Sequence, residues 1–182
     1  VPYVYPDAVN LRSYAPVSGA QPEQVQRAAQ AMAAAKRPVF YVGGGIVQAD
    51  VEVDLRELVS LLGAPVASTL MGLGAFPGTD PKSLGMLGMH GTYEANMAMH
   101  YCDVLLAVGA RFDDRVTNSD TSKFCPDATI LHVDIDPAAI SKTVTADVPI
   151  VGPVKAVLLE MINQVEKSEQ QVDAGALEIW WK

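Results

Sequence analysis

The sequence predicts an α/β fold, in which a doubly wound and mostly parallel sheet carries helices on both faces. Two observations lead to this prediction: short runs of β-forming residues are apolar throughout, and the stretches between them repeat apolar residues with a period near 3.6. Continuously apolar strands are typical of parallel sheets that crossover helices cover on both faces. Right-handed crossovers place every loop that follows a strand at one edge of the sheet, where such folds bind ligands.

The first third of the chain contains two predicted helices and two predicted strands. Pro22 suits the first turn of a helix, and the apolar stripe of that helix consists of Val25, Ala28, Ala29, Met32 and Ala33. Residues 39–42 form a strand that ends at a glycine triplet. Asp50 is a suitable N-cap for the second helix and Gly63 a suitable end; its buried stripe consists of Leu55, Leu58, Val59 and Leu62. Residues 65–69 form the next strand.

The rest of the chain continues the alternation. A loop rich in glycine and proline is predicted from residue 71 to about residue 91, and Thr92 then caps a short helix. Residues 104–108 form the clearest buried strand. After a polar loop, residues 129–133 and 148–151 form two more strands. The final helix buries one stripe, which consists of Val154, Val157, Leu158, Met161, Ile162 and Val165.

Composition narrows the class of protein. A chain of 182 residues fits one domain, and its formal charge of −8 argues against a surface for nucleic acid or an anionic membrane. The two cysteines are too few for a disulfide framework or a metal knuckle, and Cys102 is expected to be a small core residue. We find no apolar stretch that could span a bilayer and no signal peptide, so we expect no membrane partner and a cytoplasmic protein, with an organelle stroma as the alternative.

Three parts are predicted along the chain. Residues 1–19 are interpreted as a linker and extended lead-in, residues 20–166 as the domain itself, and residues 167–182 as a linker toward a further domain. The chain does not begin with Met, and two adjacent tryptophans, Trp180 and Trp181, precede its last residue. Tryptophans at a true terminus would expose much apolar surface, so we expect another domain to follow them.

Two loops of the predicted binding edge are rich in glycine or small residues. In the first, Gly43, Gly44 and Gly45 follow a strand, and glycines there let backbone N–H groups approach a diphosphate. Gln48 stands where the dinucleotide fingerprint requires a further glycine, so a plain tight turn is the alternative. The second loop contains Thr69, Leu70, Met71, Gly72, Leu73 and Gly74. It suits the edge of a flat heterocycle, although its apolar residues could instead complete the core.

The third loop combines glycines with apolar residues and one histidine. Its glycine density favours close backbone approach, and its candidate site residues are Leu87, Gly88, Met89 and His90. His90 could bind a ligand or exchange a proton, and a purely structural role is the alternative.

The last two loops carry charge. The fourth contains Gly109, Ala110, Arg111, Asp113, Asp114, Arg115 and Val116. Its arginines suit phosphate or carboxylate, and an Arg–Asp network on the surface is the alternative. The fifth contains Asp134, Ile135 and Asp136, whose carboxylates could accept hydrogen bonds from ribose hydroxyls. Asp136 could instead cap the segment that begins at Pro137. Because all five loops meet at one edge, the sequence predicts a site for a nucleotide-containing cofactor.

Several long segments are similar to one enzyme family. They read LMGLGAFP (70–77), LGMLGMHGT (84–92), AVGARFDDRVT (107–117), HVDIDP (132–137) and SKTV (141–144). With them the chain, from about residue 12 to residue 162, resembles the large catalytic subunit of acetohydroxyacid synthase, also called acetolactate synthase. The resemblance implies a Rossmann-like, DHS-like NAD/FAD-binding fold. It places the chain as the central of three domains.

The resemblance also implies an activity and cofactors. The family makes 2-acetolactate and CO2 from two pyruvate molecules, or acetohydroxybutyrate when 2-oxobutyrate replaces one of them, in branched-chain amino-acid biosynthesis. It uses FAD without net redox chemistry, together with thiamine diphosphate and Mg²⁺. The implied partners are the N- and C-terminal domains of the same subunit, a second large subunit in a homodimer or dimer of dimers, and a small regulatory subunit.

Site residues follow from the resemblance by position. The diphosphate or ribityl part of FAD would contact Gly43, Gly44 and Gly45. Its ribityl and flavin parts would contact Thr69, Leu70, Met71, Leu87, Gly88, Met89 and His90. The site would continue through Gly109, Ala110, Arg111, Asp113, Arg115 and Val116 to the adenosine end at Asp134, Ile135 and Asp136. Met89, Asp114 and Arg115 would border the substrate channel.

The chain also departs from the family. Gly152-Pro153 stands where the family usually has Gly-Asp, and Ala110 replaces a commoner valine. The chain lacks the G-D-G motif and downstream Asn that hold Mg²⁺ and thiamine diphosphate, and the family's catalytic glutamate belongs to the preceding domain. We therefore expect no catalytic residue and no metal ligand here, and no catalysis by the chain alone.

Two other functions are compatible with a nucleotide site. A freestanding flavin oxidoreductase would need a hydride-donor site, but a second dinucleotide fingerprint is missing from the sequence. A degenerate regulatory module that binds ADP or coenzyme A would be expected to lose the surroundings of Met71, Met89 and His90, which are intact.

Overall fold

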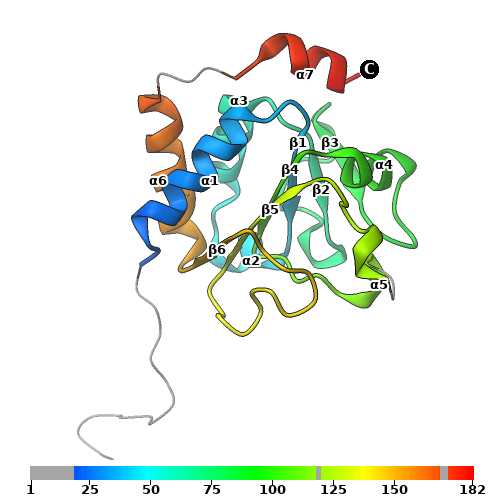
Figure 1. Cartoon of the computed structure of the whole chain (residues 1–182), viewed down its shortest axis with the longest axis horizontal. Helices are drawn as coiled ribbons and strands as arrows, with labels where there is room; N and C mark the ends of the chain where they lie inside the picture. The colour runs from blue at the N-terminus through cyan, green and yellow to red at the C-terminus, as the bar shows by residue number, and fades with distance from the viewer. Residues whose placement is uncertain (1–18, 118–119, 169–171) are drawn as a thin grey trace, which may run out of the picture.

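The computed structural model describes residues 19–117, 120–168 and 172–182. Six parallel strands form one sheet in the order β3-β2-β1-β4-β5-β6 (Figure 1). The strands are β1 (Pro38–Val42), β2 (Val66–Ser68), β3 (Ser83–Met86), β4 (Val104–Val108), β5 (Thr129–Asp134) and β6 (Val148–Val151). The predicted parallel sheet is therefore confirmed. The strand order reverses beside β1, which is the place where a doubly wound sheet opens a crevice.

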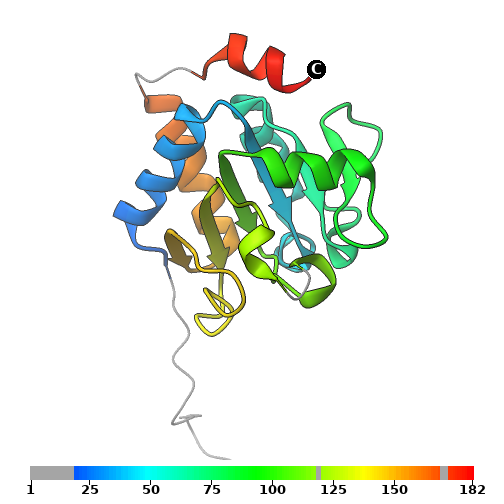
Figure 2. The ribbon, with the colours of Figure 1, turned by 45° about the vertical axis from the view of Figure 1, so that its right-hand side comes forward.

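Helices cover both faces of the sheet, as predicted (Figure 2). On one face α1 (Pro22–Ala34), α3 (Glu52–Leu62) and α6 (Val154–Lys167) pack against one another and enclose the larger core cluster. On the other face α4 (Tyr93–Tyr101) and the segments around Phe112 and Cys125 enclose the smaller cluster. Cys102 is buried there, as the sequence predicts.

The apolar stripes predicted for α1 and α3 are their buried residues, and the one predicted for α6 is buried except for its half-buried last residue, Val165. Two predicted helix boundaries are also confirmed. Thr92 caps α4, because its Oγ1 accepts a hydrogen bond from the Ala95 N–H at 3.2 Å. Gly63 ends α3 with φ +65°, a conformation that favours glycine.

The predicted N-cap at Asp50 is wrong. A short helix that the sequence did not predict, α2 (Gly44–Ala49), starts directly after β1, and Asp50 ends it in the left-handed region with φ +53°. Val51 is the N-cap of α3 and makes no side-chain cap hydrogen bond. The cause is the lack of space, since only Asp50 and Val51 separate the end of α2 from the start of α3, and Asp50 is used to end α2.

The predicted loop from residue 71 to residue 91 contains an edge strand, β3. This strand is short and half-buried, and it includes Gly85 with φ +83°, so neither apolar alternation nor a continuous apolar run marks it. Its register with β2 shifts between Val66 and Ala67. The remaining short elements are η1 (Leu70–Gly72), α5 (Asp114–Thr117) and η2 (Thr121–Lys123).

The segment predicted as a C-terminal linker contains a helix, α7 (Ala174–Trp180). It lies over the edge of the sheet at which the strands begin, here called the amino edge (Figure 1). The Trp180 Nε1–H donates to the Pro38 carbonyl at 3.2 Å, and the Trp181 Nε1–H donates to the Gly63 carbonyl at 3.3 Å. The tryptophans thus contact this domain itself. The boundary after residue 166 stays a prediction, and the predicted lead-in over residues 1–18 lies outside the described residues.

None of the helices in the described part of the chain combines the length and the apolar character needed to cross a bilayer.

Candidate cofactor site

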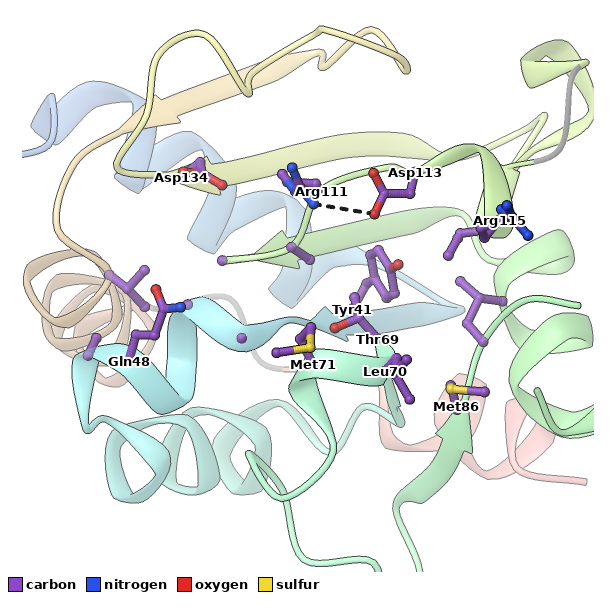
Figure 3. A pocket seen from close by; sticks show the side chains of 18 of the residues that line it. Tyr41, Gln48, Thr69, Leu70, Met71, Met86, Arg111, Asp113, Arg115 and Asp134 are labelled. Carbon is purple, nitrogen blue, oxygen red and sulfur yellow. Dashed lines mark ion pairs between the residues drawn. The ribbon is translucent and has the colours of Figure 1, made fainter. Parts of the chain in front are cut away.

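A cavity of about 1010 Å³ lies along the carboxyl edge, the edge at which the strands end (Figure 3). Every strand contributes lining residues at or just after its last residue. The lining consists of Tyr41, Gly44, Gly45, Gln48, Ala49, Thr69, Leu70, Met71, Met86, Leu87, Met89, His90, Gly109, Ala110, Arg111, Asp113, Arg115, Val116, Asp134, Ile135, Pro153, Val154 and Lys155. Its volume is at the upper end for small-molecule sites, so it suits an extended ligand.

Glycines hold the loops after β1 and β4 against each other. A Cβ on Gly43 would lie 2.1 Å from the Gly109 carbonyl oxygen, and a Cβ on Gly45 would lie 2.6 Å from the Gly109 Cα. The Gly45 N–H donates to that same carbonyl at 3.0 Å. The triplet therefore serves close packing of backbone on backbone, and Gly44 and Gly45 also line the cavity. Gly43 is not among the lining residues, so its predicted ligand contact stays a prediction.

The loop after β2 supplies an apolar rim. The Thr69 Oγ1 accepts a hydrogen bond from the Gly72 N–H at 2.9 Å, which forms the first turn of η1 and leaves the hydroxyl proton available. Leu70 and Met71 are 68% and 74% exposed. Side chains so exposed contribute little to the core, which disfavours the interpretation that this loop completes it.

Asn96 on α4 fixes the loop after β3. Its Nδ2 donates to the carbonyls of Gly88 and Thr92 at 3.2 and 2.8 Å, and its Oδ1 accepts from the Gly88 N–H at 3.2 Å. A Cβ on Gly88 would lie 2.9 Å from the Arg115 carbonyl oxygen. Gly88 is therefore a packing contact outside the cavity lining, while its neighbour Met89 lines the cavity and is 71% exposed.

The loop after β4 brings two cations to the site. Arg111 Nη2 lies 3.6 Å from Asp113 Oδ2, and Arg115 Nε lies 3.9 Å from Asp114 Oδ1. More than half of each of these side chains is exposed, and such pairs contribute little to stability. The surface network considered in the sequence analysis thus exists, but it leaves both guanidinium groups accessible to an anionic ligand. Asp114 lies outside the cavity lining.

The two aspartates after β5 have different positions. Asp134 lines the cavity, and its Oδ1 accepts a hydrogen bond from the Asp136 N–H at 2.9 Å, so its second oxygen can accept from a ligand. Asp136 lies outside the lining, and its Oδ1 accepts from the Ala138 N–H at 2.9 Å. The capping role considered for Asp136 is therefore the one that the geometry supports.

Two aromatic groups lie beneath the loop after β4. The fully buried His132 shares an Nε2 hydrogen bond of 3.0 Å with the Ala110 carbonyl, and burial lowers the pKa of its imidazole. A neutral ring with Nε2–H donating to Ala110 fits this contact. Phe112 packs edge-on against His132, with ring centroids 5.0 Å apart, and also against Tyr41 at 5.7 Å. This layer supports the loop that carries Arg111.

The structure brings most predicted site residues together at the cavity, and Gly43, Gly88, Asp114 and Asp136 are the exceptions. Sequence reasoning missed Tyr41, Gln48, Ala49, Met86, Pro153, Val154 and Lys155. The last three follow β6, so the rule that placed the other five loops at this edge could have found them. Within the described ranges, His, Cys, Asp and Glu side chains nowhere gather in a group of three that could hold a metal ion.

Comparisons with known proteins agree with this architecture. Residues 25–161 match the family model described as thiamine pyrophosphate enzyme, central domain. The chain is 52% identical to the acetolactate synthase isozyme 3 large subunit of Escherichia coli K12 over 182 residues, which is all of this chain and 32% of that protein. It is 48% identical to the acetolactate synthase large subunit of Haemophilus influenzae, over all of this chain and 31% of that protein.

The chain spans about a third of the length of these curated relatives. A solved structure has the same fold. It comes from Mycobacterium smegmatis, is described as a thiamin diphosphate-dependent enzyme, and matches with a TM-score of 0.70 and 22% identity over 91% of this chain and 32% of that one. The family match covers most of the described domain, so the chain belongs to the family of thiamine pyrophosphate enzyme central domains.

Proposed function

We propose that this chain is the FAD-binding central domain of an acetolactate synthase large subunit. The observation that carries the proposal is the single cavity at the carboxyl edge, which combines two accessible arginines, an apolar rim and a carboxylate. A dinucleotide needs these three kinds of contact for its phosphates, its flat ring and its ribose.

The proposed FAD lies along the edge of the sheet. Its adenosine half contacts Asp134 and the start of α6 near Lys155, and its flavin half contacts Thr69, Leu70 and Met89. Support comes from the order of these groups along the cavity, with Asp134 and Gln48 at one end and Leu70, Met86 and Arg115 at the other (Figure 3). Arg111 lies between the two ends, where the diphosphate needs positive charge.

The parent enzyme converts two pyruvate molecules into 2-acetolactate and CO2, or forms acetohydroxybutyrate with 2-oxobutyrate. Thiamine diphosphate and Mg²⁺ supply the carbanion chemistry when bound, and other domains of the subunit hold them. The work of this domain is to hold FAD and to border the substrate channel at Met89, Asp114 and Arg115. Its partners are the flanking domains, a second large subunit and a small regulatory subunit, and its compartment is the cytoplasm.

Ligand binding by the 182-residue chain tests the proposal. Titration with FAD, ADP and coenzyme A, each followed by a thermal-shift measurement, ranks the three ligands. We expect FAD to stabilise the chain most, although weakly, because the missing domains supply part of the natural pocket. Stronger stabilisation by ADP or coenzyme A would favour a regulatory nucleotide module and would contradict the proposal.

A turnover assay tests whether catalysis requires the other domains of the parent enzyme. We expect the chain to form no acetolactate from pyruvate when thiamine diphosphate, Mg²⁺ and FAD are present. Formation of acetolactate above the rate without protein would show that this domain carries catalytic groups, and reduction of bound FAD by NADH would support a freestanding flavin oxidoreductase instead.

A further inference from the structure

Tyr41 has a buried hydroxyl that the fold itself does not use. The residue lies near the end of β1, is fully buried, and lines the cavity. Its hydroxyl is one of only two buried side-chain polar atoms that have no hydrogen-bond partner among the described residues. A buried tyrosine hydroxyl normally has a partner, because leaving one unpaired is unfavourable. The hydroxyl therefore calls for an acceptor that the chain alone does not supply.

The packing around Tyr41 keeps the ring in place. Its centroid lies 5.7 Å from that of Phe112, and in the sheet it is paired with Ala107, which in turn pairs with His132. Figure 3 shows the ring between Asp113 on one side and Thr69 and Leu70 on the other. Because Tyr41 is among the residues that line the cavity, a ligand there is the candidate source of an acceptor.

The protonation state of Tyr41 suits a donor. Burial, assisted by the negative charge of Asp113, raises the pKa of the phenol far above its ordinary value. The hydroxyl is therefore neutral and carries its proton at neutral pH. The carboxylate of Asp113 is itself engaged by Arg111, at 3.6 Å. A neutral donor that is held in place in the wall of a ligand cavity can select a ligand that presents an acceptor atom to it.

We propose that Tyr41 is a binding residue that donates its hydroxyl proton to an oxygen or nitrogen atom of the flavin half of FAD. This inference rests on the proposed function, and it adds a residue that the sequence motifs did not indicate. The assignment to the flavin half follows from position, because Tyr41 lies beside Thr69 and Leu70, on the side of Arg111 that is away from Asp134 (Figure 3).

The experiment compares the 182-residue chain with its Tyr41→Phe variant. Dissociation constants are measured for FAD, for FMN, which lacks the adenosine half, and for ADP, which lacks the flavin half. We expect the variant to bind FAD and FMN about 10-fold more weakly, since it loses one buried hydrogen bond to the ligand, and to bind ADP as the parent chain does. Without ligand, the thermal midpoint of the variant should be unchanged or slightly higher, because an unpaired buried hydroxyl has been removed.

Tyr101→Phe is the matched control. Tyr101 ends α4, is exposed, and lies outside the cavity, so the same loss of a hydroxyl should change no affinity. Equal affinities of the Tyr41→Phe variant and the parent chain for FAD and FMN would overturn this inference alone. An equal loss for ADP, or a lower thermal midpoint without ligand, would overturn it too. A parent chain that binds neither FAD nor FMN would overturn the proposed function together with this inference.

Discussion

The two edges of the sheet are built differently. At the amino edge the chain satisfies its own polar groups: the carboxylate of Asp103 accepts hydrogen bonds from the N–H groups of Lys36 and Arg37, both at 2.9 Å, and α7 covers the start of β1 through Trp180. At the carboxyl edge the loops pack backbone on backbone, and their side chains turn outward around a cavity. One edge thus serves the stability of the fold, and the other leaves its side chains available for a ligand.

Glycine makes the open edge possible. Because Gly43, Gly45 and Gly109 allow two loops to touch through their backbones, those loops are fixed without using their side chains. Arg111 then remains accessible although the backbone of its loop is held. Substitutions at one edge can therefore change stability or ligand binding separately.

The largest effect is expected from Gly109→Ala at the carboxyl edge. Gly109 has φ +56°, and an added Cβ would lie 2.7 Å from the Gly45 Cα, so the variant combines backbone strain with a clash against backbone. We expect the free energy of unfolding to fall by more than about 3 kcal/mol in urea denaturation.

Gly78→Ala is the matched control for that variant. Gly78 has no neighbour within 4 Å of an added Cβ and does not require a positive φ. Its substitution should change the free energy of unfolding by less than about 0.5 kcal/mol. Similar effects of the two substitutions would contradict the close approach of the loops.

A smaller effect is expected at the closed edge from Asp103→Ala. The variant leaves two backbone N–H groups without their acceptor, and we expect it to lower the free energy of unfolding by about 1–2 kcal/mol. The affinity of the variant for FAD should equal that of the parent chain under conditions in which both are folded, because Asp103 lies at the edge away from the cavity. Isothermal titration calorimetry checks this, and a weaker FAD complex would show that the two edges are not independent.

The pH dependence of the free energy of unfolding tests the burial of His132 beneath the loop after β4. Burial lowers the pKa of His132 below its ordinary value, so the unfolded chain binds a proton more readily than the folded one. The contribution of His132 is fully present above the unfolded pKa of about 6.5 and is lost as the pH falls toward the folded pKa. Urea denaturation should show that the free energy of unfolding falls between pH 7.5 and pH 5.5. The His132→Gln variant should show a smaller fall, whereas a variant of the exposed His100, His100→Gln, should show the same fall as the parent chain. If the free energy of unfolding depended on pH in the same way in the parent chain and both variants, the role assigned to His132 would be contradicted.

The smallest effect is expected from Asp113→Asn, which removes an exposed ion pair at the open edge. Because both partners are more than half exposed, the free energy of unfolding should change by less than about 0.5 kcal/mol. A loss above 1 kcal/mol in urea denaturation would mean that the charged loop stabilises the fold and does not simply present Arg111.

The difference between the edges also explains what could be predicted from the sequence. The helices α1, α3 and α6 bury whole stripes, such as Leu55, Leu58, Val59 and Leu62 in α3, and such periodicity is visible in the sequence. Strands β1 and β4 are fully buried and stand out as apolar runs. Where tertiary contacts decide, prediction failed: β3 is held by its pairing with β2, and α2 starts too early for Asp50 to cap α3.

The site shows the same limit. Strand ends and charged loops located Arg111, Arg115 and Asp134 at the cavity, since one rule of topology places all strand ends together. The same rule says which edge a residue occupies and not whether it faces the cavity; Gly43 and Asp136 lie at that edge but outside the lining, and their ligand contacts stay predictions. Tyr41 reads as an ordinary core residue in the sequence, and only the unpaired hydroxyl in the structure distinguishes it.

Hydrogen–deuterium exchange of the 182-residue chain, with and without saturating FAD, tests the central claim most directly. We predict that FAD slows exchange in the segments that end β1, β2, β4 and β5, around Gly45, Thr69, Arg111 and Asp134, and leaves α7 and the segment around Asp103 unchanged. Slower exchange confined to the amino edge, or no change at the carboxyl edge at a concentration that saturates binding, would contradict the assignment of the cavity to FAD.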